Sequence, residues 1–211
     1  MTIDNWDLEL HGMMHTGISN KINAVVDAVQ DDIFKNNGFR VWNNEGMDVF
    51  LPSPDNDIII VFTHFLNHFY GEGVGLRQIC DWCRLLWTFK GTLNYGVLET
   101  RILKAGVMTE WKAFAAFVVE YLGMSEDSVP FYERTVSMHK KARRICSLIL
   151  ETGSFGQNKD YSYRKTSSKI MSRFVTFYTR LYEFAKISMI FPVNAPKFFV
   201  NYVLGRIKAA E

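Results

Sequence analysis

The densest group of residues that could do chemistry lies between positions 64 and 82. His64 and His68 are four residues apart, so on a helix the two imidazoles share one face, as a pair that binds a metal or an anion would. Arg77 and Asp81 repeat this spacing after a glycine-rich turn that brings the end of one helix close to the start of the next. We therefore expect all four side chains to converge on one substrate-binding site. The competing interpretation is that His68 caps the turn and Arg77 pairs with Asp81 as a packing contact.

Three other chemistries are disfavoured in the same segment. A zinc protease needs Glu directly after the first histidine, and Phe65 occupies that place. The turn at residues 71–75 lacks the Gly-Lys-Ser/Thr of a phosphate loop, and Glu72 would repel a phosphate. Cys80 and Cys83 fall inside a predicted helix without a second pair, which favours small core residues over a redox or zinc site.

The elements that must position these residues are mostly helices. Residues 6–10 alternate apolar and acidic side chains like a strand, and residues 39–42 and 47–51 flank a turn and predict one hairpin. Apolar residues at helical spacing predict helices over 19–34, capped by Ser19, and over 57–70, 76–90, 109–122, 133–151, 167–190 and 195–209. The expected fold is mainly α, a helical bundle preceded by a short N-terminal β remnant and the hairpin. We expect a remnant of an α/β domain over 1–52 and a helical domain with a basic C-terminal part over 53–211.

Composition bounds the class of protein. A chain of 211 residues that is 48% hydrophobic and 15% aromatic can bury a core, which excludes global disorder. No apolar run approaches the roughly 18 residues that would span a bilayer, and three acidic residues precede the first apolar stretch, unlike a signal or transit peptide. Three cysteines give no disulfide framework. We therefore expect a soluble protein of the cytoplasm.

Charge is distributed unevenly along the chain. Residues 1–133 hold nine Lys and Arg against 18 Asp and Glu, whereas residues 134–211 hold 15 against four. One interpretation is that the basic part folds back on the acidic part or only solvates a helix face. The other is that it meets a polyanion such as a nucleotide, nucleic acid or anionic membrane. Residues 186–208 are also apolar with flanking cations, which fits either a terminal helix pair or a membrane-surface hairpin.

Three segments carry a family resemblance: Leu8–His11 after a short strand, His64-x-x-x-His68, and Gly73–Trp82 with its Gly-Leu-Arg-Gln-x-x-Asp-Trp ending. Together they resemble the C-terminal part of the uncharacterised bacterial nucleotidyltransferase-like family of the DNA polymerase beta superfamily. The resemblance covers about residues 5–120 and is strongest over 64–82. It implies a small mixed sheet that carries the catalytic acids, followed by a helical domain that carries the histidines, Arg77 and Asp81.

The resemblance also implies a chemistry. In this superfamily an Asp-x-Asp pair and a third carboxylate hold two Mg²⁺ ions that activate the attacking hydroxyl and neutralise the leaving pyrophosphate. Glu9 matches the third carboxylate, which makes it the implied catalytic residue and metal ligand. No Gly-Ser and Asp-x-Asp precede it. We therefore expect a truncated or incomplete member that binds Mg²⁺ only if another chain supplies the missing carboxylates; the alternative is that Glu9 is a plain solvent-facing strand residue.

Two functions follow as hypotheses. The first is a nucleotidyltransferase-like protein, inactive alone, which when complete transfers a nucleotidyl group from an NTP to an unknown acceptor. In this hypothesis Arg77 contacts a phosphate, Asp81 orients it, and a histidine binds or deprotonates the acceptor. The family's association with polysaccharide biosynthesis suggests that the acceptor is a sugar or glycan. The second is a non-catalytic binding module for a partner chain, a second copy or an anionic ligand. Nucleic acid is not an expected partner, and Arg134 and His139 are one residue short of the spacing of a HEPN-type ribonuclease.

Overall fold

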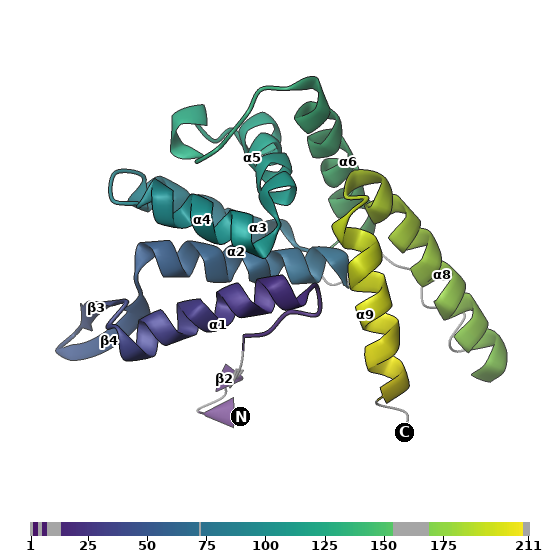
Figure 1. Ribbon diagram of the computed structural model, residues 1–211, viewed down its shortest axis with the longest axis horizontal. Coiled ribbons are helices and arrows are strands. Elements are labelled where there is room, and N and C mark those ends of the chain that lie inside the picture. Colours follow the sequence, from purple (N-terminus) through teal and green to yellow (C-terminus); the bar gives the residue numbers. More distant parts are fainter. Residues whose placement is uncertain (1, 4–5, 8–13, 72, 154–168, 209–211) are drawn as a thin grey trace.

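Helices form most of the part of the chain that the computed structural model describes, namely residues 2–3, 6–7, 14–71, 73–153 and 169–208 (Figure 1). This confirms the expected fold, mainly α with a small hairpin. The helices are α1 (Asn20–Lys35), α2 (Pro54–Tyr70), α3 (Leu76–Phe89), α4 (Tyr95–Ala105), α5 (Met108–Leu122), the 3₁₀ turn η1 (Glu126–Ser128), α6 (Val136–Thr152), α8 (Lys169–Ile190) and α9 (Asn194–Lys208).

Helix α1 forms as its sequence predicts. The Ser19 hydroxyl caps it by accepting the backbone N–H of Ile22 at 3.3 Å. Its buried residues recur at helical spacing and are Ile22, Val25, Val26 and Val29. This side of α1 packs against α2 and α4, so α1 belongs to the helical bundle.

Helix α4 was missed by the sequence analysis. It buries only Leu98, Ile102 and Ala105, too few apolar positions to stand out in an otherwise exposed segment. Two terminal signals mark it nonetheless. The Asn94 side chain accepts the backbone N–H of Val97 at 3.1 Å, and Gly106 ends the helix in the left-handed conformation at φ 72°.

The two pairs of strands are short. In the hairpin, β3 (Phe39–Asn44) pairs with β4 (Met47–Pro52), one or two residues longer than predicted at their ends. The connecting Glu45 and Gly46 both have positive φ, 53° and 89°, the conformation of a two-residue turn that matches strand twist. At the N-terminus β1 (Thr2–Ile3) pairs with β2 (Trp6–Asp7). The rest of the strand predicted over 6–10, including Glu9, lies outside the described residues.

Helix α2 lies at the centre of the core. Its residue Phe62 is fully buried, with ring centroids 4.7 Å from Trp111, 5.1 Å from Phe65, 5.5 Å from Trp82 and 6.4 Å from Phe114. These rings come from α2, α3 and α5, so one aromatic cluster joins three helices. Aromatic side chains are not confined to this core, since Phe34, Trp42 and Trp87 are exposed.

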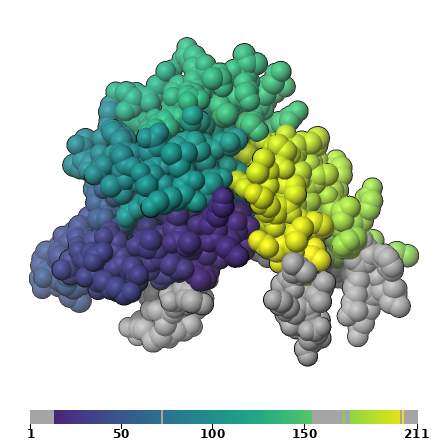
Figure 2. Space-filling view, in the orientation of Figure 1, coloured from purple at the N-terminus to yellow at the C-terminus, as the bar shows by residue number. Residues whose placement is uncertain are grey.

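The last two helices pack back on this core. Apolar side chains from both are buried: Phe184, Ile187, Ile190, Phe191, Ala195 and Phe198. Figures 1 and 2 show α9 beside the start of α1, where Asn201 donates a hydrogen bond to the Ile18 carbonyl at 3.2 Å. This burial favours a terminal helix pair over a membrane-surface hairpin for residues 186–208. Within the described residues, no helix combines the length and the hydrophobicity needed to cross a bilayer.

A buried polar cluster joins α2, α5 and α9. Glu110 is 2% exposed, and one of its oxygens, Oε1, accepts the Tyr70 hydroxyl at 2.9 Å and the Asn194 amide at 2.8 Å. The other oxygen, Oε2, is buried without a hydrogen-bond partner among the described residues. Burial raises the pKa of Glu110 above its ordinary value, although these hydrogen bonds and the charge of Lys141 act in the opposite direction. Burial also raises the pKa of Tyr70, and the negative charge and the hydrogen bond of Glu110 raise it further.

Replacing Phe62 with alanine tests the aromatic centre. Removing a fully buried ring leaves a cavity, and such substitutions cost about 3–5 kcal/mol of unfolding free energy. Phe34→Ala is the matched control, because Phe34 is 78% exposed and its loss should cost less than about 0.5 kcal/mol. Urea unfolding followed by circular dichroism measures both variants. Equal losses of stability in the two would contradict the assignment of Phe62 to the centre of the core.

Glu110 predicts a specific dependence of stability on pH. Because its folded pKa lies above the ordinary value of 4.5, this carboxyl favours the folded state at acidic pH, and that contribution is lost as pH rises through the folded pKa. Glu110→Gln keeps an oxygen for Tyr70 and Asn194 but does not ionise. The difference in unfolding free energy, variant minus wild type, should therefore become more positive as the pH rises from 4.5 to 8. Parallel stability profiles for the two proteins would show that Glu110 is not the responsible group.

Candidate functional site

The C-terminal end of α2 is held by a cation from a distant helix. The N–H of Gly71 donates to the carbonyls of Asn67 and His68 at 3.0 and 3.1 Å, which closes the last turn of α2. The Gly71 carbonyl in turn accepts a hydrogen bond from Nη1 of Arg180, on α8, at 2.6 Å. A guanidinium at this position complements the partial negative charge of a helix C-terminus. The sequence analysis missed Arg180, which lies 109 residues from Gly71.

Three asparagines from three helices fix the segment before α1. Asn23 Oδ1 accepts the N–H of Thr16 at 2.8 Å, and Asn67 Oδ1 accepts the N–H of Gly17 at 3.1 Å. Asn201 completes the set through its bond to Ile18. A side-chain amide has one oxygen that accepts and one NH₂ group that donates. Because the oxygens of Asn23 and Asn67 accept backbone N–H groups, their NH₂ groups remain able to donate to another partner.

These groups surround a cavity of about 440 Å³, within the size range of small-molecule sites. We call it the asparagine cavity. Its lining residues come from α1, α2, α8, α9 and the segment before α1, and they are Thr16, Gly17, Ser19, Asn20, Asn23, Asn67, His68, Gly71, Arg180, Phe198 and Asn201. Apart from Phe198 and the two glycines, every one of these side chains is polar.

Several hydrogen-bond donors in the cavity lining have no acceptor among the described residues. The NH₂ groups of Asn23 and Asn67 have no acceptor there, and neither do Nε and Nη2 of Arg180. Glu183 accepts a long 3.5 Å bond from Nη1 of Arg180. A ligand in this cavity therefore meets mainly N–H groups, which bind carboxylate, phosphate and hydroxyl oxygens.

Both predicted histidines lie at this end of α2. Their Nε2 atoms are 3.2 Å apart, so the i, i+4 spacing places the imidazoles on one face as expected. His64 is exposed, and His68 is half-buried and lines the asparagine cavity. In this contact one Nε2 donates its hydrogen and the other accepts it, so the two rings are in different tautomers when both are neutral.

Arg77 and Asp81 lie elsewhere on the surface. Both are exposed on α3, and neither is among the residues that line the asparagine cavity. No hydrogen bond or ion pair joins Arg77 to Asp81 in the part of the chain that the structure describes. The structure thus brings His64 and His68 together and places His68, with Arg180, in the lining of the asparagine cavity. The roles of Arg77 and Asp81 in binding a substrate stay predictions.

The metal prediction rests on Glu9, which lies outside the described residues. Among the residues that are described, no group of three or more His, Cys, Asp or Glu side chains is placed to hold a metal ion. His64 and His68 thus form a pair that no described third side chain completes. Magnesium binding stays a prediction tied to carboxylates from elsewhere.

The cysteines are free thiols in different environments. Cys83 is buried, and its burial, together with the neighbouring Cys80, raises its pKa to about 12. A thiol with this pKa is a poor nucleophile at neutral pH, which agrees with the interpretation of Cys83 as a core residue. Cys80 is exposed, so that interpretation is wrong for Cys80.

Comparisons with known proteins return no relative. No protein-family model, curated protein or solved structure matches this chain. The function is therefore argued from the site itself.

Proposed function

We propose that this chain is a binding module for a small ligand that carries an oxyanion, with a phosphate monoester as the best-fitting class. The observation that carries the proposal is the set of unused donors in the asparagine cavity. Arg180 supplies a charged, planar donor group. Asn23 and Asn67, whose oxygens bind the segment before α1, supply neutral NH₂ donors.

The polar lining also favours a ligand with hydroxyl groups. Ser19 accepts the N–H of Ile22 through its oxygen, so its own O–H remains able to donate, and Asn20 adds an amide that is not engaged in the described residues. Phe198 gives one apolar wall against which a ring can pack. A sugar phosphate matches each of these features, with the phosphate near Arg180 and His68 and the hydroxyls toward the asparagines.

A second candidate is the acceptor-binding part of a nucleotidyltransferase. The observation that favours it is the position of His68, one of the residues of the family resemblance, in the wall of the asparagine cavity. In this function the cavity holds the acceptor, and Glu9 joins carboxylates of another chain to hold Mg²⁺ for transfer from an NTP. Binding of the acceptor would then precede any chemistry and would need no metal.

Calorimetric titration with inorganic phosphate and with glucose 6-phosphate tests the proposal. We expect both to bind without Mg²⁺, glucose 6-phosphate more tightly, and the affinity of each to fall as salt is raised because the contacts involve charge. Arg180→Gln removes a charge-assisted hydrogen bond worth about 1.5–3 kcal/mol, so Kd should rise at least about tenfold.

Asn67→Asp makes the test specific to the donor group. The variant keeps an oxygen for the N–H of Gly17 but replaces the NH₂ group by a carboxylate oxygen, so binding should be abolished while the fold is kept. Asn94→Asp is the matched control and should leave the Kd unchanged, because Asn94 Oδ1 also accepts a backbone N–H, from Val97 at 3.1 Å, and Asn94 does not line the asparagine cavity. Unchanged Kd values in Arg180→Gln and Asn67→Asp would refute the proposal.

A further inference from the structure

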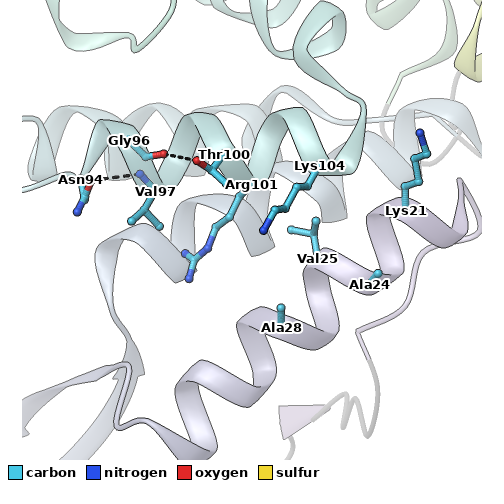
Figure 3. Close-up of a pocket in the computed structure, with 10 residues that line it drawn as sticks. All are labelled: Lys21, Ala24, Val25, Ala28, Asn94, Gly96, Val97, Thr100, Arg101 and Lys104. Atoms are coloured by element: carbon cyan, nitrogen blue, oxygen red, sulfur yellow. Dashed lines mark hydrogen bonds between the residues drawn. The ribbon is translucent and has the colours of Figure 1, made fainter.

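A second cavity lies between α1 and α4, on the other side of α1. Its volume is about 790 Å³, and we call it the basic groove. The residues that line it are Lys21, Ala24, Val25, Ala28, Asn94, Gly96, Val97, Thr100, Arg101 and Lys104. The groove stays open because small side chains, Ala24 and Ala28 on α1 and Gly96 on α4, face it where larger ones would close it (Figure 3).

Three cations from two helices line the groove. Figure 3 shows Arg101 and Lys104 extending from α4 toward α1, over the side of α1 that carries Val25 and Ala28. Arg101 is fixed at its place by the Asp55 carbonyl at 3.0 Å and the Asp32 carboxylate at 3.6 Å. Lys21 stands on the first turn of α1 at the far end of the groove.

Two of these cations have no counterion in the part of the chain that the structure describes. Within the described residues, Lys21 and Lys104 form no hydrogen bond and no ion pair, and both are exposed. This is unusual for residues 1–133, where acidic residues outnumber Lys and Arg two to one. Other cations of the same segment are paired with acids in the structure, namely Lys35, Arg40, Lys90 and Lys112.

The floor of the groove is apolar. Val25, Ala24 and Ala28 form the α1 side, and Val97, 38% exposed, lies opposite on α4. The Thr100 hydroxyl donates to the Gly96 carbonyl at 2.8 Å, and the Asn94 oxygen caps α4, which leaves the Asn94 NH₂ group as a polar donor in the lining. The groove therefore combines an apolar surface with positive charge along one side.

We propose that the basic groove binds an amphiphilic anion, a ligand with an apolar body and a phosphate or carboxylate group. The body lies on Ala24, Val25, Ala28 and Val97 and removes their apolar surface from water. The anionic group lies beside Lys104 and Arg101, with Lys21 adding to the positive potential at the end of the groove. This site is separate from the asparagine cavity, since the two share none of their lining residues.

Titration with octyl phosphate below its critical micelle concentration tests this site, with binding followed by calorimetry. Because octyl phosphate is itself a phosphate monoester, the titration uses a chain that carries Arg180→Gln, which impairs the asparagine cavity. In this background we expect saturable binding of octyl phosphate, and at least tenfold weaker binding of inorganic phosphate and of octanol, because each lacks one of the two parts. Lys104→Ala should raise the Kd about tenfold, and Ala28→Phe should abolish binding by filling the floor. Lys21→Ala should weaken binding less, since Lys21 stands at the end of the groove.

Two controls separate this proposal from other effects. Lys35→Ala removes a lysine of the same helix that is paired with Asp31, so it should leave the Kd unchanged. Because Arg180→Gln impairs the asparagine cavity in every variant of this test, the binding that remains belongs to the groove, and the two sites can fail independently. The proposal is overturned if Lys104→Ala and Ala28→Phe, each in this background, bind octyl phosphate as tightly as the Arg180→Gln chain alone, or if inorganic phosphate binds as tightly as octyl phosphate.

Discussion

The burial of one face of α2 is the constraint on which the rest of the structure depends. Phe62 contacts rings from α3 and α5, so removing water from this single side chain requires three helices to meet. About two turns beyond Phe62, Tyr70 packs on Phe198 of α9 with ring centroids 5.5 Å apart. The position of α2 thereby sets the positions of the helices on either side of it.

The polar features follow from where this apolar helix ends. Its last carbonyl groups need donors, and the chain supplies them with the N–H groups of Gly71 and Gly73 and the guanidinium of Arg180. The same end lies beside the segment before α1, whose backbone N–H groups are bound by Asn23 and Asn67. A set of donors therefore gathers around one cavity because several backbone ends meet there, and among the described residues no acceptor meets the NH₂ groups of Asn23 and Asn67.

Much of the fold could be predicted from the sequence, because most helices carry local signals. Ser19 before a regular apolar stripe predicts α1, and Ser53-Pro54 marks the start of α2. Helix α4 shows the limit of this approach, since its three buried residues give a weak pattern and its stability depends on packing against α1 and α2. The turn of the hairpin was placed too wide, because Asn43 and Asn44 pair with Asp48 and Met47 and so extend β3 beyond its predicted end at Trp42.

The site could be predicted only in part. The spacing of His64 and His68 was enough to place both on one face, since four residues are about one helical turn. Arg180 had no local signal, because it reaches Gly71 only through the packing of α8. The asparagines were also overlooked, because no local signal marks contacts between helices: Asn67 lies near the end of α2, 50 residues from the Gly17 whose N–H it accepts. The burial of Glu110 in the first turn of α5, where an acid is commonly exposed, likewise required the tertiary structure.

The central claim is that NH₂ groups of Asn23 and Asn67, with Arg180, bind an oxyanion in the asparagine cavity. Side-chain NH₂ signals in ¹H–¹⁵N correlation spectra, assigned with the Asn→Asp variants, report on these groups directly during a titration with inorganic phosphate. The account predicts saturable shifts of the Asn23 and Asn67 pairs, with no shift of Asn43 in the hairpin. If both pairs stay unmoved while phosphate binding saturates elsewhere, the account is contradicted.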